Sequence, residues 1–521
     1  MPDTLQAASL SWALTHVRKF GDTDIFPLPF EYDAIAHDWN SIGPFLENVD
    51  LAEHKVRPDR VMMALKPGGG FRAATQLDPL DHLLYTAAVY EASDLIEKAR
   101  VPADQRIVCS YRIQLTPEGA FFAPDSGWKD YHSRSKELAN TGDISYALNA
   151  DISDFYNQIS QHRIQNAMEI AAVPVERSQN IERFLNLLTG KQSQGLPVGP
   201  FASIVLAEAC LIDVDNFLLH LNVHFVRYVD DFRIFCSSRK VAAETKHALA
   251  KYLFTGHRLS LESAKSSVIH IKRFVKEELS DPEELEQQAK IDHVNKIFDE
   301  LAEEKGPYWF EDFDAESEAE VLTKAQRDSF IQLFEECVTK RPLHLGLARY
   351  LLRKASRSRT NALVNLVFQN LENLAPTLRD VVRYLAVTIP KSQASKRGKE
   401  IMKFCKANPV GALPFVRVWL LELLYRRPDL CSAVEALALA EESNTDLGSR
   451  PTALLAAAHK QIDWVRARKE AWRNYEPWSR RALIWSSSIL PSGEKRPFLN
   501  MVSEQGDQLD AAVAKFLLSK G

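Results

Sequence analysis

Three segments of the chain carry acidic and polar residues at spacings suited to phosphoryl transfer. The first, ADISDFY, is a β-rich run that ends in Asp151 and then turns into a helix. The second is the loop QGLPVGP, which begins at Gln194 and leads into an apolar helix. The third, FVRYVDDFRIF, places Asp230 and Asp231 between two short β-rich runs, as at the tip of a hairpin.

The adjacent aspartates of the third segment indicate a metal site. Two carboxylates this close repel each other, and each raises the pKa of the other unless a cation lies between them. Mg²⁺ binds through a few carboxylates together with substrate phosphates, so the pair suits such an ion. With Asp151 from a neighbouring strand, Asp230 and Asp231 would supply the ligands of a two-metal phosphoryl-transfer site.

Each segment read alone has a plainer interpretation. Aspartate is common in turns, so Asp230 and Asp231 could close an ordinary hairpin. The loop QGLPVGP could be a plain breaker segment, since Gly and Pro interrupt regular structure. The three segments in this order favour the catalytic interpretation, because the combination is far rarer than any one of its parts.

Composition narrows the class of protein. A chain of 521 residues, 45% hydrophobic and 26% charged, is typical of a soluble protein with two or three domains. No apolar run is long enough to span a bilayer, and the N-terminus lacks the order of a secretory signal, so we expect no membrane association. The six cysteines occur singly, which favours a reducing, cytoplasmic location. The net charge of -5 argues against coating nucleic acid through bulk positive charge but allows a local basic groove.

The pattern of the sequence changes twice along the chain. Residues 1–60 read as an N-terminal extension, residues 61–275 alternate short β-rich runs with helical patterns, and residues 276–521 show amphipathic helices only. Prolines break the helical region at Pro342, Pro376, Pro390, Pro409 and Pro428. Recurring helix pairs suggest a HEAT-like solenoid, with an irregular helical bundle as the alternative.

At these motifs the sequence resembles the fingers and palm of a reverse transcriptase, over about residues 55 to 275. ADISDFY is similar to motif A of that family, QGLPVGP to motif B and YVDD to motif C. LSLESAK, which ends at Lys265, resembles motif D, in which a lysine protonates the departing pyrophosphate. KPGGGFR, from Lys66 to Arg72, resembles the fingers hairpin, in which a lysine and an arginine hold the incoming triphosphate. The SYR segment that begins at Ser110 resembles a further fingers motif.

The resemblance implies a fold class and a set of site residues. The fold is an α+β right-hand polymerase fingers and palm, followed by an all-α helical-repeat domain. The implied catalytic residues are Asp151, Asp230, Asp231 and Lys265; the metal ligands are Asp151, Ile152, Asp230 and Asp231; the nucleotide-binding residues are Lys66, Arg72, Tyr156, Gln194 and Gly195. Two Mg²⁺ ions, for which Mn²⁺ can substitute, are the implied cofactors.

Several of these residues also have a simpler interpretation. Tyr156 takes the place of an aromatic steric gate, which would collide with a 2′-hydroxyl and so select deoxynucleotides. The alternative is that Phe155 or Tyr156 packs beneath the palm. Gln194 could be a solvated loop amide, and Lys66 and Arg72 could belong to a solvated basic turn.

The helical region points to one group within the family. The sequence has no RNase H pattern of carboxylates and no HNH-type cluster. A helical region in their place is similar to the abortive-infection and related defence-associated reverse transcriptases of bacteria. This resemblance implies a DNA polymerase of anti-phage defence that uses dNTPs and assembles as a homo-oligomer. Some members work without a template and prime from a tyrosine of their own, which leaves the DNA covalently attached. Tyr32, Tyr308 and Tyr475 are candidates here, because their sequence context favours exposure. Other members copy a noncoding RNA.

Two other functions stay open at this point. One is a retron-like or other cellular reverse transcriptase that copies a specific RNA template. The other is a catalytically silent scaffold that binds RNA or proteins. Two basic stretches, residues 352–359 and 391–399, and the segment from Trp464 to Arg481 suit a nucleic-acid-binding surface. The last segment could instead be a solvated helix face with its tryptophans turned inward.

Overall fold

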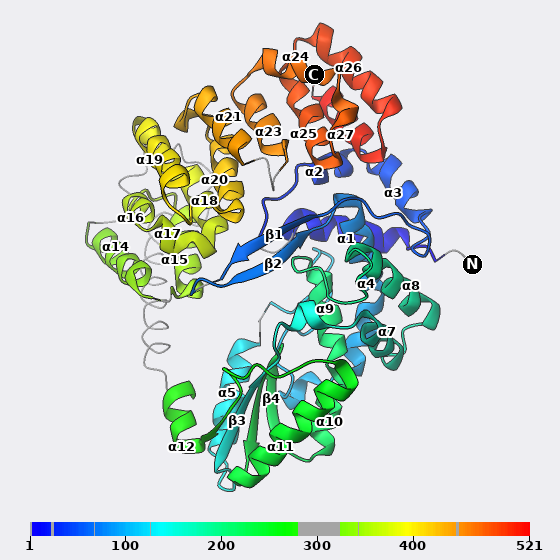
Figure 1. Ribbon diagram of the computed structural model, residues 1–521, viewed down its shortest axis with the longest axis vertical. Helices are drawn as coiled ribbons and strands as arrows, with labels where there is room; N and C mark the ends of the chain where they lie inside the picture. The colour runs from blue at the N-terminus through cyan, green and yellow to red at the C-terminus, as the bar shows by residue number, and fades with distance from the viewer. Residues whose placement is uncertain are drawn as a thin grey trace. The chain divides into compact units, whose positions relative to one another are not determined.

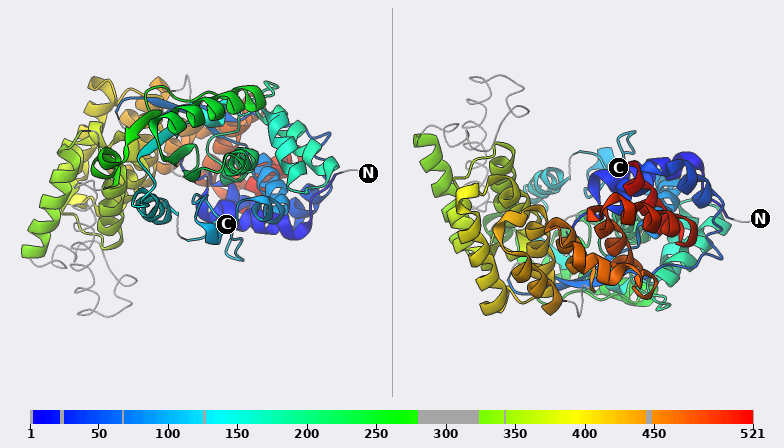
Figure 2. Two further views of the ribbon diagram at one scale, coloured as in Figure 1. Left: turned by 90° about the horizontal axis from the view of Figure 1, so that it is seen from below. Right: turned by 90° about the horizontal axis from the view of Figure 1, so that it is seen from above.

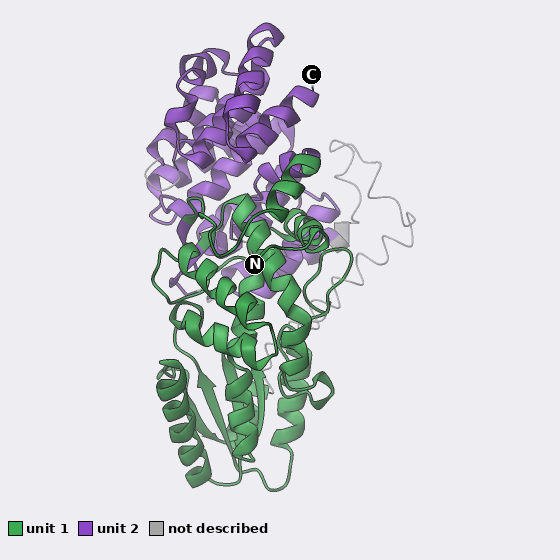
Figure 3. Cartoon of the chain, turned by 90° about the vertical axis from the view of Figure 1, so that its right-hand side faces the viewer, with its two compact units in different colours: residues 1–23, 39–60, 75–284 green, residues 24–38, 61–74, 285–521 purple. Residues whose placement is uncertain are grey.

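The structure is a computed structural model, and its description covers seven stretches of the chain. These are residues 3–21, 25–66, 68–124, 127–279, 324–341, 343–443 and 448–520. The chain divides into two compact units, shown in two colours in Figure 3. The palm unit comprises residues 1–23, 39–60 and 75–284, and the helical unit comprises residues 24–38, 61–74 and 285–521. Within the described stretches, no helix has the length and apolarity needed to cross a membrane.

The palm unit contains an antiparallel four-stranded sheet. Its strands are β3 (Tyr146–Asp151), β4 (His224–Tyr228), β5 (Asp231–Cys236) and β6 (Ser267–His270), in the spatial order β4-β5-β3-β6 (Figure 1). Residues 232–236 of β5 are all buried, so both faces of the central strand are covered. The helix α11 (Arg239–Tyr252) packs on β3 and β5, and α5 (Trp128–Ala139) packs on β4 and β5.

Helices make up most of the remainder of the palm unit. They are α1 (Ala7–Phe20), α3 (Trp39–Glu47), α4 (Pro79–Ala99), α6 (Phe155–Gln158), α7 (Gln161–Ile170), α8 (Val175–Leu188), α9 (Phe201–Cys210), α10 (Ile212–His220) and α12 (Ile271–Phe274). The central helix is α4, which packs against both α1 and α9. It begins where the sequence supplies an N-cap, because the Asp78 side chain accepts the backbone N–H of Leu80 and Pro79 occupies the first turn.

Two histidines lie in the core between α1 and α4. His82 is 0% exposed and His16 is 1% exposed, with Nδ1 of His16 2.7 Å from the carbonyl oxygen of Gly119. Burial lowers the pKa of His82 to about 3 and the pKa of His16 to about 4. Both rings are therefore neutral in the folded protein.

Acidification below pH 6.5 is expected to destabilise the palm unit through its two buried histidines. Below the ordinary histidine pKa of 6.5, His16 and His82 bind protons in the unfolded chain but not in the folded protein. The free energy of unfolding therefore falls as the pH falls. The loss is about 2 kcal/mol for each histidine at pH 5. Thermal unfolding at pH 7 and pH 5 measures it. His82→Gln should flatten the pH dependence, whereas His220→Gln, at an exposed position, should not. If His82→Gln kept the pH dependence of the wild type, the burial of a neutral His82 would not be a source of that dependence.

The helical unit contains one short hairpin and a long array of helices. The hairpin is β1 (Arg60–Leu65) with β2 (Phe71–Gln76), of which residues 61–74 belong to this unit. The helices are α2 (Glu31–His37), α14 (Lys324–Thr339), α15 (Leu345–Arg357), α16 (Val364–Gln369), α17 (Leu371–Leu374), α18 (Leu378–Thr388), α19 (Ala394–Ala407), α20 (Pro414–Arg426), α21 (Ala433–Glu442), α23 (Arg450–Ala458), α24 (Ile462–Lys469), α25 (Pro477–Ser486), α26 (Ser492–Gln505) and α27 (Gln508–Ser519).

The array is ordered along the chain. Helix α15 packs on α18, α18 on α20, α20 on α23, α23 on α25 and α25 on α27, so that neighbours in sequence are neighbours in space (Figures 1 and 2). Packing of successive helices of this series against each other, with contacts to segments near in the chain, is the arrangement of a solenoid. Pro376 and Pro428 lie in short 3-10 helices between α-helices, Pro390 and Pro409 lie in connections between helices, and Pro342 lies outside the described residues. The prediction of a mixed α+β region followed by an all-α region is confirmed.

Residues 1–60, predicted as one N-terminal extension, are shared between the two units. Helix α1 packs on α4 of the palm unit, whereas α2 packs on α27 of the helical unit. Glu31, in α2, is 0% exposed and binds two arginines of distant helices. Its carboxylate accepts hydrogen bonds from Arg450 at 2.6 and 2.8 Å and from Arg481 at 3.0 Å. Burial alone would raise the pKa of Glu31, but the charges of Arg450 and Arg481 lower it, so the carboxylate is held ionised.

Candidate active site

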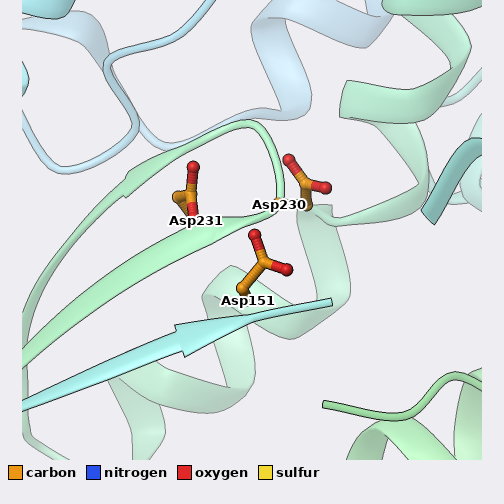
Figure 4. Close-up of side chains that lie close together, drawn as sticks. All are labelled: Asp151, Asp230 and Asp231. Atoms are coloured by element: carbon orange, nitrogen blue, oxygen red, sulfur yellow. The ribbon is translucent and has the colours of Figure 1, made fainter. Parts of the chain in front are cut away.

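The sheet register brings the three predicted aspartates together. Asp151 ends β3 and lies directly opposite Asp231, the first residue of β5, while Asp230 occupies the turn that joins β4 to β5. One carboxylate oxygen of each residue lies within 4.8 Å of those of the other two (Figure 4). This cluster is the one group of three or more potential metal ligands of this kind in the described part of the chain.

The cluster is electrostatically strained. Desolvation raises the pKa of Asp231 to about 7, and a hydrogen bond with Asp151 and the charges of Asp230 and Asp151 act in the same direction. Nζ of Lys265 lies 3.0 Å from Oδ1 of Asp151, and this hydrogen bond raises the pKa of the lysine. One ammonium does not balance three carboxylates, so the cluster attracts further cations.

The donor set suits a hard divalent cation. All three side chains offer carboxylate oxygens, which are the ligands that Mg²⁺ and Mn²⁺ favour. Ile152, the fourth predicted ligand, has an apolar side chain and is buried, so it could contribute only its backbone carbonyl oxygen. Its N–H donates to the carbonyl oxygen of Asp230 at 3.3 Å, which ties the end of β3 to the turn.

The predicted steric gate follows Asp151 on a short helix. The chain turns at Asp154, whose φ is 48°, into α6. Phe155 is 2% exposed and packs inward, whereas Tyr156 is only half-buried. Of the two aromatic residues, Phe155 therefore packs beneath the palm, and Tyr156 is left as the candidate gate.

The loop that begins at Gln194 is fastened to the same helix. The N–H of Gly195 donates to Ile159 O at 2.7 Å, and the N–H of Leu196 donates to Tyr156 O at 2.9 Å. Gly195 has φ +83°, a conformation that favours glycine, and a Cβ there would make a tight contact of 3.3 Å with the carbonyl oxygen of Asn157. Gln194 is exposed, and its Nε2 donates to Oε1 of Gln158 at 2.7 Å. The structure thus brings the predicted residues Tyr156, Gln194 and Gly195 together.

The predicted triphosphate ligands Lys66 and Arg72 lie on the β1–β2 hairpin of the helical unit. Both are exposed, and the N–H of Lys66 donates to Gly70 O at 2.8 Å, which closes the turn. They belong to a different compact unit from the aspartates, and their role in nucleotide binding stays a prediction.

The candidate priming tyrosines differ in their exposure. Tyr32 is 1% exposed, so its predicted exposure is wrong, because α2 packs against α27. Tyr475 is half-buried, and Tyr308 lies outside the described residues.

The arginines of the segment from Trp464 to Arg481 include two with acidic partners. Arg481 binds the buried Glu31, and Arg480 pairs with Asp507 and Asp510 at 2.7 and 2.8 Å. Trp472 and Trp478 are buried and Trp464 is half-buried, which favours the alternative interpretation of this segment, a helix face with its tryptophans turned inward.

Sequence reasoning missed a group of buried ionic residues beneath the aspartates, which includes Glu208, Asp215 and Arg227. Their signal in the sequence was a charged residue inside an apolar run. Glu208 interrupts FASIVLAEACLI, and Arg227 interrupts the β-rich run that leads to Asp230. Buried charges occur in such runs only when they are paired.

Comparison with known proteins finds a family match over the part of the chain that holds the three aspartates. Residues 98–316 match the family described as reverse transcriptase (RNA-dependent DNA polymerase). The chain contains a reverse-transcriptase domain. The match includes the three aspartates and Lys265, and it does not include the hairpin residues Lys66 and Arg72.

More distant similarity adds little to this domain assignment. No curated protein matches the sequence. A structure of telomerase from Candida albicans with a fragment of telomeric RNA matches with 11% identity and a TM-score of 0.32, covering 75% of this chain and 71% of that chain. Apo telomerase from Candida tropicalis matches with 10% identity and a TM-score of 0.32, covering 78% and 70%. TM-scores this low carry no information about the function of the present chain.

Proposed function

We propose that this chain is a DNA polymerase of the reverse-transcriptase type, which adds dNTPs by two-metal phosphoryl transfer. The observation that carries the proposal is the cluster of Asp151, Asp230 and Asp231, with carboxylate oxygens within 4.8 Å of one another inside the matched domain. Three carboxylates crowded at one end of a sheet are unfavourable without cations. They suit a site whose task is to bind metal and triphosphate together.

The residues of the cluster have separable roles in the proposed reaction. Two Mg²⁺ or Mn²⁺ ions, when bound, would neutralise the triphosphate and ease deprotonation of the attacking hydroxyl. Asp151 and Asp231 face each other across β3 and β5, and Asp230 lies in the adjoining turn, so these three side chains would hold the ions. The hydroxyl oxygen forms a bond to the α-phosphorus and loses its proton to solvent, while the bond to the bridging oxygen breaks and pyrophosphate leaves.

Lys265 is suited to act as the general acid of this reaction. Its ammonium group is bonded to Asp151 and its pKa is raised, so it carries a proton at neutral pH. The side chain is 66% exposed and can move from Asp151 when cations take its place. In the proposed reaction it donates its proton to the departing pyrophosphate.

Loss of the ring at Tyr156 is expected to relax the choice of sugar. Tyr156→Ala should raise the rate of ribonucleotide relative to deoxynucleotide incorporation by about 10- to 200-fold, because the collision with the 2′-hydroxyl is removed. Tyr156→Phe keeps the ring and should keep the selectivity. Single-nucleotide incorporation with dGTP and GTP measures the ratio. Equal selectivity in Tyr156→Ala and wild type would exclude Tyr156 as the gate.

The biological role is proposed on the family resemblance given above. A helical-repeat region that follows the polymerase domain in the chain supports a role in bacterial anti-phage defence. The protein would then lie in the cytoplasm and assemble as a homo-oligomer. The attacking hydroxyl is either the 3′-hydroxyl of a primer annealed to an RNA template or the side-chain hydroxyl of a tyrosine of the chain. Among the described candidates, Tyr475 retains partial exposure, which favours it over the buried Tyr32.

Nucleotide incorporation by the purified full chain tests the proposal. The assay contains Mg²⁺ or Mn²⁺ and labelled dNTPs, with and without an RNA template. We expect labelled product in at least one arm. Label that migrates with the protein on a denaturing gel after nuclease treatment supports tyrosine priming, and Tyr475→Phe should then abolish it. Product that requires RNA supports templated synthesis. No incorporation in any arm would overturn the proposal in favour of a catalytically silent scaffold.

A further inference from the structure

A buried ionic network lies beneath the hairpin that carries Asp230 and Asp231. It consists of Arg100, Ser110, Glu208, Asp215 and Arg227, which are 3%, 0%, 1%, 0% and 0% exposed. Two arginines balance two carboxylates, as buried ionic groups require. The reaction proposed above uses none of these residues. Most of their hydrogen bonds join one another, and two reach the backbone of Val229, the residue before Asp230.

Arg227 reaches Val229 from within β4. Its Nε and Nη2 donate to the two carboxylate oxygens of Asp215 at 2.7 and 2.6 Å. Its Nη1 donates to Glu208 at 3.0 Å and to the carbonyl oxygen of Val229 at 2.9 Å. The bidentate pair with Asp215 fixes the plane of the guanidinium. The Nη1 group is therefore presented to Val229 in a set direction.

Ser110 reaches Val229 from the segment that runs beside β4. Its hydroxyl donates to Oε1 of Glu208 at 2.5 Å and accepts the backbone N–H of Val229 at 2.9 Å. Arg100 donates to Oε2 of Glu208 and to the carbonyl oxygen of Ser110, each at 2.8 Å. Both backbone polar groups of Val229 are thus bound by side chains that are themselves fixed.

Val229 needs such restraint because its backbone conformation is unfavourable. Its φ is 54°, in the left-handed region, where a β-branched residue is a rare outlier. Such a conformation persists only when the surroundings impose it. If Val229 relaxed to a negative φ, the direction of the following Asp230 would change.

We propose that Ser110 and Arg227 are positioning residues of the polymerase site, which hold Val229 left-handed so that Asp230 and Asp231 face Asp151. The inference rests on the proposed function and deepens it. It gives a role to Ser110, which heads the SYR segment noted in the sequence, and to the charge of Arg227 inside an apolar strand. Ser110 is the better probe, because its removal leaves every buried charge in place.

The test compares Ser110→Ala with a matched buried serine. Ser93 is also 0% exposed and lies in the same unit, but its hydroxyl donates to Val89 O within its own helix at 2.7 Å. Ser110→Ala is expected to lower kcat about tenfold and to raise the half-saturating Mg²⁺ concentration about tenfold, with the KM for dNTP nearly unchanged. Ser93→Ala should leave all three values at the wild-type level. Ser110→Thr, which keeps a hydroxyl, should restore kcat.

A double variant separates positioning from general stability. Glycine adopts positive φ freely, so Ser110→Ala should cost much less activity in a Val229→Gly background than in the wild type. An equal cost in both backgrounds, or wild-type kcat and metal dependence in Ser110→Ala, would overturn the inference.

Mn²⁺ binding followed by electron paramagnetic resonance gives a readout that does not need turnover. Weaker binding in Ser110→Ala than in Ser93→Ala supports the positioning role. If wild type binds Mn²⁺ without incorporating nucleotides, the proposed function fails while this comparison still decides the role of Ser110. Equal binding in the two variants would count against positioning.

Discussion

Asp230→Asn is expected to lower kcat for nucleotide incorporation by at least about a thousandfold, ~4 kcal/mol in the barrier. The amide keeps the shape of the side chain but removes one of the three negative charges that would hold the metal ions. The same change should leave the thermal unfolding midpoint at pH 8 unchanged or raise it. The pKa of Asp231 is raised to about 7, so above that pH the folded protein holds an ionised group that its surroundings disfavour. Removing the neighbouring charge relieves this repulsion.

Incorporation assays and thermal unfolding on the same preparations test both parts. Asp143→Asn is the control, because Asp143 is an exposed aspartate of the same unit, outside the cluster. It should keep wild-type activity and stability. Activity within tenfold of wild type in Asp230→Asn would exclude the cluster as the metal site. A lowered unfolding midpoint would instead show that Asp230 has a structural role.

Glu31→Gln is expected to destabilise the helical unit by about 3–5 kcal/mol, the usual effect of removing one partner from a buried ion pair. The change leaves Arg450 and Arg481, which are 7% and 0% exposed, without the carboxylate that binds them both. Because α2 packs on α27, its release should expose apolar surface at the C-terminal end of the array. The thermal unfolding midpoint should fall by several degrees.

Calorimetry of the full chain measures this effect, with Asp33→Asn as the control. Asp33 lies two residues from Glu31 in the same helix, but it is exposed, so its replacement should shift the midpoint little. Equal shifts in the two variants would show that Glu31 is not the anchor. Acid should mimic the substitution, since the stability from Glu31 is present above its ordinary pKa of 4.5 and is lost as the pH falls through its lowered value.

The chemistry of the site was readable from the sequence because each motif is local. A β-rich run that ends in Asp151 and a hairpin with Asp230 and Asp231 at its tip follow from short-range patterns. So does the change from mixed to all-helical structure, because amphipathic periodicity is a property of each helix alone. The pairing of Asp151 with Asp231 across β3 and β5 needed only that the two strands be neighbours.

The tertiary structure alone decided what supports these motifs. Ser110 and Val229 are 119 residues apart, and Glu31 and Arg450 are 419 residues apart, so no local pattern could pair them. Helices from elsewhere in the chain determine which of Phe155 and Tyr156 packs inward. They also bury Tyr32. Sequence periodicity shows that a residue is apolar or charged and on which face it lies. The partner of that residue depends on how the elements pack. A buried charge or backbone polar group without a partner costs free energy, so the packed structure must supply one.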